Sequence, residues 1–316
     1  MINKNRQPTG QSSNLSTLGA YLNLHLVVLI WGFTAILGKL ITIPVVEVVF
    51  YRTLIAVITL YFLIRWRGID FHIGGKNLVG ILGTGALIGM HWILFFLAAR
   101  VSNVSICLAG MATTSLWTSL IEPIFTKTKI KFYEPVLGII AIIGISVVFD
   151  AVVDQWLGFF LAVISALLSA VFTVLNGKLV KHFNHFTITM YEMAGAWIIC
   201  LIFLPLYAYL ITGQGIQLAL HGMDFIYLLV LGLICTVFAY SLSVKLMHRL
   251  TAFTINLTVN LEPVYGILLA LLIFKDQEKM GTNFYIGTSI ILISVLLYPL
   301  IRNKKFKKMV KRQIFK

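Results

Sequence analysis

The sequence predicts an all-α integral membrane protein whose ten transmembrane helices form two inverted five-helix repeats. Its composition is strongly apolar, with 59% hydrophobic and 11% charged residues, whereas an average soluble domain carries about 25% charged residues. The apolar residues gather into ten segments, each close to the roughly 20 residues that a helix needs to cross a bilayer. Lysines and arginines collect at every second break between these segments, which is typical of a multi-pass membrane protein.

The predicted spans follow one another with short polar breaks. They are residues 21–40, 45–64, 78–98, 103–124, 132–149, 156–177, 186–211, 225–244, 250–273 and 283–301. They divide into a first repeat (21–149) and a second repeat (150–301), flanked by a polar N-terminal segment (1–20) and a basic tail (302–316). The N-terminal segment lacks the basic-then-apolar pattern of a signal peptide, so we expect no cleavage.

The net charge of +14 could indicate nucleic-acid binding, but the placement of the cations argues against it. Arg52 is the one cation in the interior of a predicted span. Four others lie at the ends of spans or in the breaks on one side, namely Lys39, Arg100, Lys275 and Lys279. The remaining 20 lie on the other side, with both termini. The positive-inside rule predicts cytoplasmic termini, and we expect membrane lipids rather than nucleic acid as partners. The basic tail suits an amphipathic helix on the anionic leaflet or a disordered segment equally well.

Cysteine and glycine patterns predict no cofactor. Cys107, Cys200 and Cys235 fall inside apolar spans without metal or disulfide spacing, so we expect them to pack as small apolar residues. The glycines of the third span lack the lysine of a nucleotide-binding loop. Two of them, Gly85 and Gly89, have the four-residue spacing of close helix packing. The sequence therefore predicts no metal site and no ATP site.

Residue matches between the two halves indicate an internal duplication. Each match is weak alone, but together they keep their order, with a drift that loop insertions explain. They are Gly38-Lys39-Leu40 with Gly177-Lys178-Leu179 at an offset of 139, Tyr51 with Tyr191 at 140, and Arg100 with Arg249 and Gly138 with Gly287 at 149. Because each half has an odd number of spans, the halves must have opposite orientations, as in many secondary transporters.

Three runs of residues resemble the EamA family of the drug/metabolite transporter superfamily. They are Ile30 to Ala35 (IWGFTA), Tyr51-Arg52, and Asn260 to Gly266 (NLEPVYG), which continues to Lys275-Asp276-Gln277-Glu278. The resemblance covers about residues 22–301 as two repeats. It implies a transporter that exports small metabolites, such as amino acids, or drug-like compounds.

One departure from this family concerns the fourth span. The family often has a proline midway along it, but here the stretch is Thr113 to Trp117, and Pro123 follows only near the end. We therefore expect the central helices of the two halves to bend differently.

Charged side chains inside the spans are the main site candidates, because each costs about 2.5–3.5 kcal/mol at the bilayer centre on insertion scales. Glu262 lies near mid-depth beside Pro263, and is either a substrate or proton site or a structural strut. Asn256 and Asn260 share a helical face that differs from the face of Glu262, and the sequence does not decide which face lines a cavity.

The second and seventh spans carry Arg52 and Glu192 at nearly matching repeat positions. They either flank a pathway or pair locally. In the third span, His91 could carry a proton or be a neutral, hydrogen-bonded residue. Trp31 and Trp92 lie too deep for an interfacial belt, so they line a cavity or simply pack.

These observations predict a secondary active transporter that works by alternating access, with a small-molecule substrate and possibly protons as partners. An alternative is a nucleotide-sugar or sugar-phosphate carrier of the same superfamily, which would need more cations at mid-depth than Arg52. A membrane enzyme is a third class, but His91 has no carboxylate or second histidine within a helical turn. We therefore expect no enzymatic activity.

Overall fold

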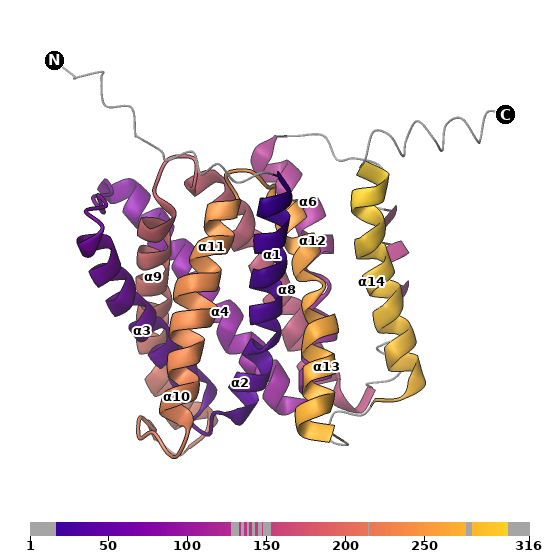
Figure 1. Cartoon of the computed structure of the whole chain (residues 1–316). Helices are drawn as coiled ribbons and strands as arrows, with labels where there is room; N and C mark the ends of the chain where they lie inside the picture. The colour runs from indigo at the N-terminus through magenta and orange to yellow at the C-terminus, as the bar shows by residue number, and fades with distance from the viewer. Residues whose placement is uncertain are drawn as a thin grey trace.

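The computed structural model describes residues 17–127, 153–213, 215–275 and 280–302, together with residues 133, 136, 137, 139, 140, 143, 144 and 147. In this part of the chain every regular element is helical (Figure 1). α1 begins and α14 ends at the same end of the bundle, uppermost in Figure 1. We call it the termini end and the opposite one the distal end.

The helices of the first half account for four of the predicted spans. They are α1 (Thr17–Gly32), α2 (Thr34–Leu40), α3 (Val45–Trp66), α4 (Gly75–Val101), α5 (Val104–Met111) and α6 (Thr114–Thr126). The fifth predicted span, 132–149, lies largely outside the described residues, as do most of the N-terminal segment and nearly all of the basic tail.

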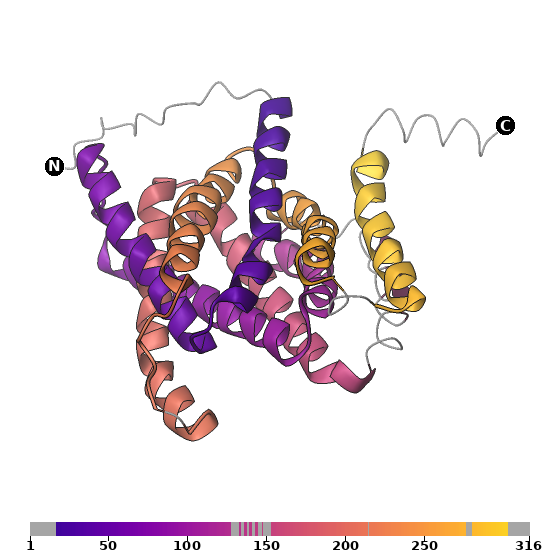
Figure 2. The same ribbon diagram turned by 60° about the horizontal axis from the view of Figure 1, so that its bottom comes forward.

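The helices of the second half cover the other five predicted spans. They are the short η1 (Val153–Gln155), α8 (Trp156–Leu179), α9 (His185–Leu206), η2 (Tyr207–Ile211), α10 (Asp224–Leu229), η3 (Val230–Phe238), α11 (Ala239–Leu246), α12 (Ala252–Val259), α13 (Glu262–Phe274) and α14 (Thr282–Arg302). Within the described residues, eight helical stretches are long and apolar enough to cross a membrane. α14 lies at the edge of the bundle in both views (Figures 1 and 2).

Broken helices in the fourth and ninth spans reveal the repeat directly. α5 and α6 are separated at residues 112–113, and α12 and α13 at residues 260–261, 148 positions later. The first and last residues of α5 and α12, and those of α6 and α13, all differ by this offset. So do the N-caps Asn103 and Thr251, whose side chains accept a hydrogen bond three residues on. The predicted difference in bending between the two central helices is therefore wrong at this level, because the break forms with or without a proline.

Two tyrosines tie each half to a loop of the other. The Tyr51 hydroxyl on α3 donates to the carbonyl of Leu218 at 2.7 Å, and that of Tyr191 on α9 donates to the carbonyl of Phe71 at 3.0 Å. The two tyrosines are 140 positions apart in the sequence, as predicted, and the two residues whose carbonyls accept are 147 positions apart. The two crossover contacts thus follow the same inverted symmetry.

A π-helix explains one step in the offset between the repeats, from 147 to 148. η3 is a nine-residue π-helix, in which the Thr236 hydroxyl donates to the carbonyl of Leu231, five residues earlier. A π-bulge corresponds to one inserted residue. The offset is accordingly 147 before η3, at Phe71 and Leu218, and 148 after it, at the broken helices.

Glycines hold α4 and α9 at very close range. A Cβ at Gly85 would overlap the Glu192 carbonyl, and a Cβ at Gly195 would overlap the Leu82 carbonyl. Gly89 faces the backbone of Ala196, with 3.1 Å between its ideal Cβ and the Ala196 Cα. The predicted packing role of Gly85 and Gly89 is therefore confirmed.

Polar contacts close the distal end of the bundle. Both carboxylate oxygens of Asp224 accept from Thr42, one from its amide at 2.8 Å and one from its hydroxyl at 2.6 Å. Nearby, Arg100 donates to the carbonyls of Gly38 and Ile41. We call the Thr42–Asp224 contact the distal clasp.

Candidate functional site

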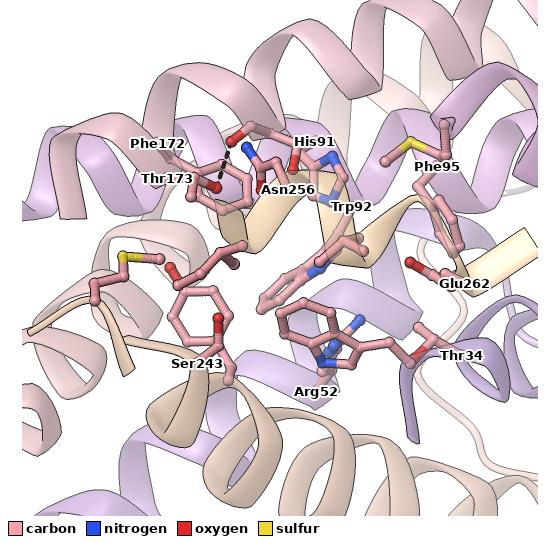
Figure 3. Close-up of a pocket in the computed structure, with 17 residues that line it drawn as sticks. Thr34, Arg52, His91, Trp92, Phe95, Phe172, Thr173, Ser243, Asn256 and Glu262 are labelled. Carbon is pink, nitrogen blue, oxygen red and sulfur yellow. Dashed lines mark hydrogen bonds between the residues drawn. The ribbon is translucent and has the colours of Figure 1, made fainter. Parts of the chain in front are cut away.

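A cavity of about 60 Å³ lies between the two halves (Figure 3). It is lined by α1, α2, α3, α4 and α5 from the first half and α8, α11, α12 and α13 from the second. Its lining residues are Trp31, Thr34, Arg52, His91, Trp92, Phe95, Met111, Ser169, Phe172, Thr173, Tyr240, Ser243, Met247, Ile255, Asn256, Val259 and Glu262. A cavity at the interface of inverted repeats is where transporters bind substrate.

The break between α12 and α13 decides which polar residues of the ninth span reach this cavity. Asn256 and Glu262 both line it, although a continuous helix would place them on different faces. Asn260 points instead to α6, where its amide donates to the Ser115 hydroxyl at 2.6 Å. Asn256 also bonds α6, through the Thr118 hydroxyl at 2.8 Å.

Glu262 is the first residue of α13 and is 7% exposed on the cavity wall. A carboxylate at a helix N-terminus is favoured by the unsatisfied amides and the helix dipole there. Within the described part of the chain no side chain or backbone group hydrogen-bonds its carboxylate, and its charged neighbour is Arg52. Its acceptor oxygens are therefore available to a molecule in the cavity.

Arg52 also lines the cavity, 1% exposed and held from two sides. Its Nε donates to the Thr236 hydroxyl at 2.7 Å, which the π-helix η3 directs towards it. Its guanidinium stacks on the Trp92 ring, 3.7 Å from the ring centroid. Its Nη1 is buried and makes no hydrogen bond with the described residues. This donor is the polar group that a ligand would complete.

Aromatic rings make up much of the wall between these charges. Trp31 is fixed by its indole nitrogen, which donates to the Cys235 carbonyl at 3.1 Å. Trp92 packs edge-on to Tyr240, with 6.2 Å between the ring centroids. Phe95 and Phe172 complete the apolar surface (Figure 3).

His91 is anchored to α8. Its Nδ1 lies 2.9 Å from the Ser165 carbonyl, which can only accept, so Nδ1 carries a proton. The Ser165 hydroxyl in turn donates to the His91 carbonyl at 2.8 Å. A neutral His91 therefore presents an unprotonated Nε2, and its position matches the hydrogen-bonded alternative of the sequence analysis.

Glu192 does not line the cavity and is completely buried. Its Oε2 accepts from the Tyr240 hydroxyl at 3.1 Å, and Tyr240 also accepts from the Asn176 amide at 2.8 Å. Tyr240 itself lines the cavity, so one side chain separates Glu192 from it. Of the eight predicted site residues, six line the cavity, and Glu192 and Asn260 do not.

Sequence reasoning missed several wall residues that the repeat could have revealed. Thr34 and Thr173 are 139 positions apart and both line the cavity, and Tyr240, which also lines it, comes 148 positions after the predicted Trp92. None is unusual alone in an apolar span. Paired repeat positions were the available signal. Among the described residues no three His, Cys, Asp or Glu side chains come together as a metal site requires.

Comparisons with known proteins agree with this architecture. The model of the EamA-like transporter family matches residues 18–150 and 156–299. A solved crystal structure described only as that of a protein superposes with a TM-score of 0.68 at 15% identity, over 92% of this chain and 100% of the other. At that identity the likeness shows the fold alone. The comparison with curated proteins found no match. Because the family model covers both halves nearly completely, the chain belongs to the EamA-like transporter family.

Proposed function

We propose that this protein is a ten-helix secondary transporter of the bacterial inner membrane, with cytoplasmic termini, that exports small metabolites by alternating access. Amino acids or related amphipathic compounds are the proposed substrates. The eight residues named from the sequence form the wall of the binding site and the layer behind it.

The observation that carries this proposal is a set of unpaired polar groups at one part of the cavity. Within the described residues, Arg52 Nη1 is buried without a hydrogen bond, the buried Thr34 hydroxyl has only the weakly bonding Cys235 thiol beside it, and the Glu262 carboxylate accepts no hydrogen bond. A buried polar group without a partner costs about 1–3 kcal/mol. A zwitterion would supply all three partners, with its carboxylate on Arg52 and Thr34 and its ammonium on Glu262.

The remainder of the wall suits an apolar substituent on that zwitterion. Trp31, Trp92, Phe172 and Tyr240 offer ring faces or edges. Arg52 is the only lysine or arginine among the described lining residues. One guanidinium is a poor match for a diphosphate, so the wall favours the amino-acid class over a nucleotide sugar.

A transport screen in proteoliposomes tests this proposal. We expect counterflow of radiolabelled amino acids with large apolar side chains, and little of UDP-sugars or sugar phosphates. Arg52→Gln and Glu262→Gln should each lower transport by at least about tenfold, as the loss of a charged hydrogen bond implies. Lys181→Gln, an exposed change outside the cavity, is the control. Transport of nucleotide sugars alone would overturn the proposed substrate class.

A further inference from the structure

Arg52 and Glu192 occupy equivalent places in the two halves. Each is the eighth residue of its helix, α3 or α9, and they are 140 positions apart. Each contacts an aromatic residue of its own half, Arg52 the Trp92 ring and Glu192 the Tyr240 hydroxyl. These aromatic residues are equivalent too, 148 positions apart. The repeat therefore carries one structural motif twice, with opposite charge.

The helix that covers each charged residue does so through an equivalent glycine. Gly85 of α4 lies on the carbonyl of Glu192, where an added Cβ would overlap the oxygen. Gly232 of η3, 147 positions later, faces the carbonyl of Arg52, but its Cβ would be 3.4 Å from that oxygen and would meet the Ile55 side chain first, at 2.7 Å. The same interface is thus tight at Glu192 and looser at Arg52.

This inequality matches the direction in which the cavity extends. Met247 and Ile255, near the termini end, line the cavity, whereas their repeat equivalents Ala99 and Cys107 do not. Gly38, near the distal end, is pressed against the Phe96 ring, whereas its equivalent Gly177 has open space where a Cβ would lie. The structure is therefore closed at the distal end and looser at the termini end.

Glu192 has no evident purpose in this arrangement. It is completely buried, and its Oε1 makes no hydrogen bond with the described residues. A carboxylate in the bilayer interior is costly and demands compensation. Tyr240 bonds one of its two oxygens, and the Asn176 amide is the other polar side chain beside the carboxylate. A second conformation that exposes Glu192 to water or substrate would not carry this cost.

We propose that Glu192 is a second charged residue of the substrate site, which the cavity reaches when it faces the distal end, in the place that Arg52 has here. The inference rests on the proposed function, since it assumes alternating access. In inverted-repeat carriers the two halves exchange conformations. The interface of α4 with α9 would then loosen to the geometry that η3 has on α3, which uncovers Glu192 behind Tyr240.

The exchange changes the sign of the charge at the site. With the cavity towards the termini end, Arg52 attracts an anionic group such as the carboxylate of an amino acid. With the cavity towards the distal end, Glu192 faces the same space and repels that carboxylate. A substrate carboxylate is thus bound when the cavity faces the termini end and released when it faces the distal end. This residue pair therefore favours transport from the termini end to the distal end.

Cysteine labelling in proteoliposomes tests the exchange without a known substrate. Arg52→Cys and Glu192→Cys are made separately in the full chain with Cys107, Cys200 and Cys235 replaced by alanine, and are treated with a small, charged thiol reagent. Each is combined with Gly85→Ala, which cannot fit against the Glu192 carbonyl in the present arrangement. In the exchanged arrangement, the alanine side chain at position 85 would face residue 195, as Gly232 faces Ile55 here. Residue 195 is a glycine and therefore leaves space for it. Gly83→Ala on the same helix faces open space and is the matched control.

We expect Gly85→Ala to raise the labelling rate of Glu192→Cys by at least about tenfold, a shift of about 1.4 kcal/mol between the two states. It should lower that of Arg52→Cys, by a smaller factor because Ile55 hinders close approach of η3. Gly83→Ala should change neither rate. If Gly85→Ala prevents folding, Asp224→Asn, which weakens the distal clasp, should act in the same direction.

Three outcomes overturn the inference: no labelling of Glu192→Cys in any variant, parallel increases at both positions, which indicate local loosening, or an equal response to Gly83→Ala. Opposite changes at the two positions support it. If they occur while the screen finds no amino-acid transport, the exchange stands and the proposed substrate class fails. If amino acids are transported while Glu192→Cys stays unlabelled, the proposed function stands and the exchange fails.

Discussion

Glu262 is the residue at which a proton-binding role and a structural role can be separated. Because the described residues provide its carboxylate with no hydrogen bond, Glu262→Gln should remove little stability and leave the melting temperature within about 2 °C. If the carboxyl exchanges protons during transport, the transport that remains in the variant should lose its pH dependence, and substrate binding should be weaker but still detectable. Transport at several pH values and melting in detergent measure both.

The opposite result has a clear form. A large drop in melting temperature with unchanged pH dependence would show that Glu262 is a strut. A variant normal in both respects would exclude both roles.

At the same scale, the sequence identified most of the charged and aromatic wall because burial of such groups in lipid is costly and their presence is conspicuous. It could not place Asn260, whose direction depends on the helix break, or Glu192, which Gly85 and Tyr240 seal. Thr34 escaped notice because a threonine is well tolerated in an apolar helix. Side-chain direction was therefore less predictable than side-chain chemistry.

Apart from the fifth span, which lies largely outside the described residues, the helices were predicted to within a few residues, because their lengths follow from bilayer thickness and their ends from polar breaks. The π-helix η3 and the break in the fourth span were not predicted. The first depends on one residue more in one half than in the other, and the second forms without a proline. Both are features of packing between halves, which one segment of sequence does not contain.

A matched glycine pair tests this packing. Gly38→Ala should destabilise the protein by about 1–3 kcal/mol, because its Cβ would overlap the fully buried Phe96 ring. Gly177→Ala, at the equivalent position, meets open space and should be neutral or stabilise by about 0.5–1 kcal/mol through helix propensity. Melting temperatures in detergent compare the two, and equal effects would contradict the described asymmetry.

For the molecule as a whole, the charge pattern predicts the orientation. Single cysteines at Asn14 and Lys311 should resist an impermeant thiol reagent in intact cells, whereas one at Gln155, at the distal side, should react. The test needs the native cysteines replaced as above. Labelling at Lys311 from outside would overturn both the cytoplasmic termini and the ten-span topology.

The distal clasp has an energetic consequence for the resting protein. Two hydrogen bonds from Thr42 to the Asp224 carboxylate hold the distal end shut. The equivalent positions at the termini end are Lys181 and Asn77, neither of which has a carboxylate for such a contact. A hydrogen bond to a charged group contributes about 1.5–3 kcal/mol, which alone makes one orientation about ten to a hundred times more populated than the other. Without substrate, the protein would thus mainly populate the orientation whose cavity faces the termini end. Turnover would then be limited by the step that opens the clasp, and a substrate would speed that step only by binding the rarer orientation more tightly.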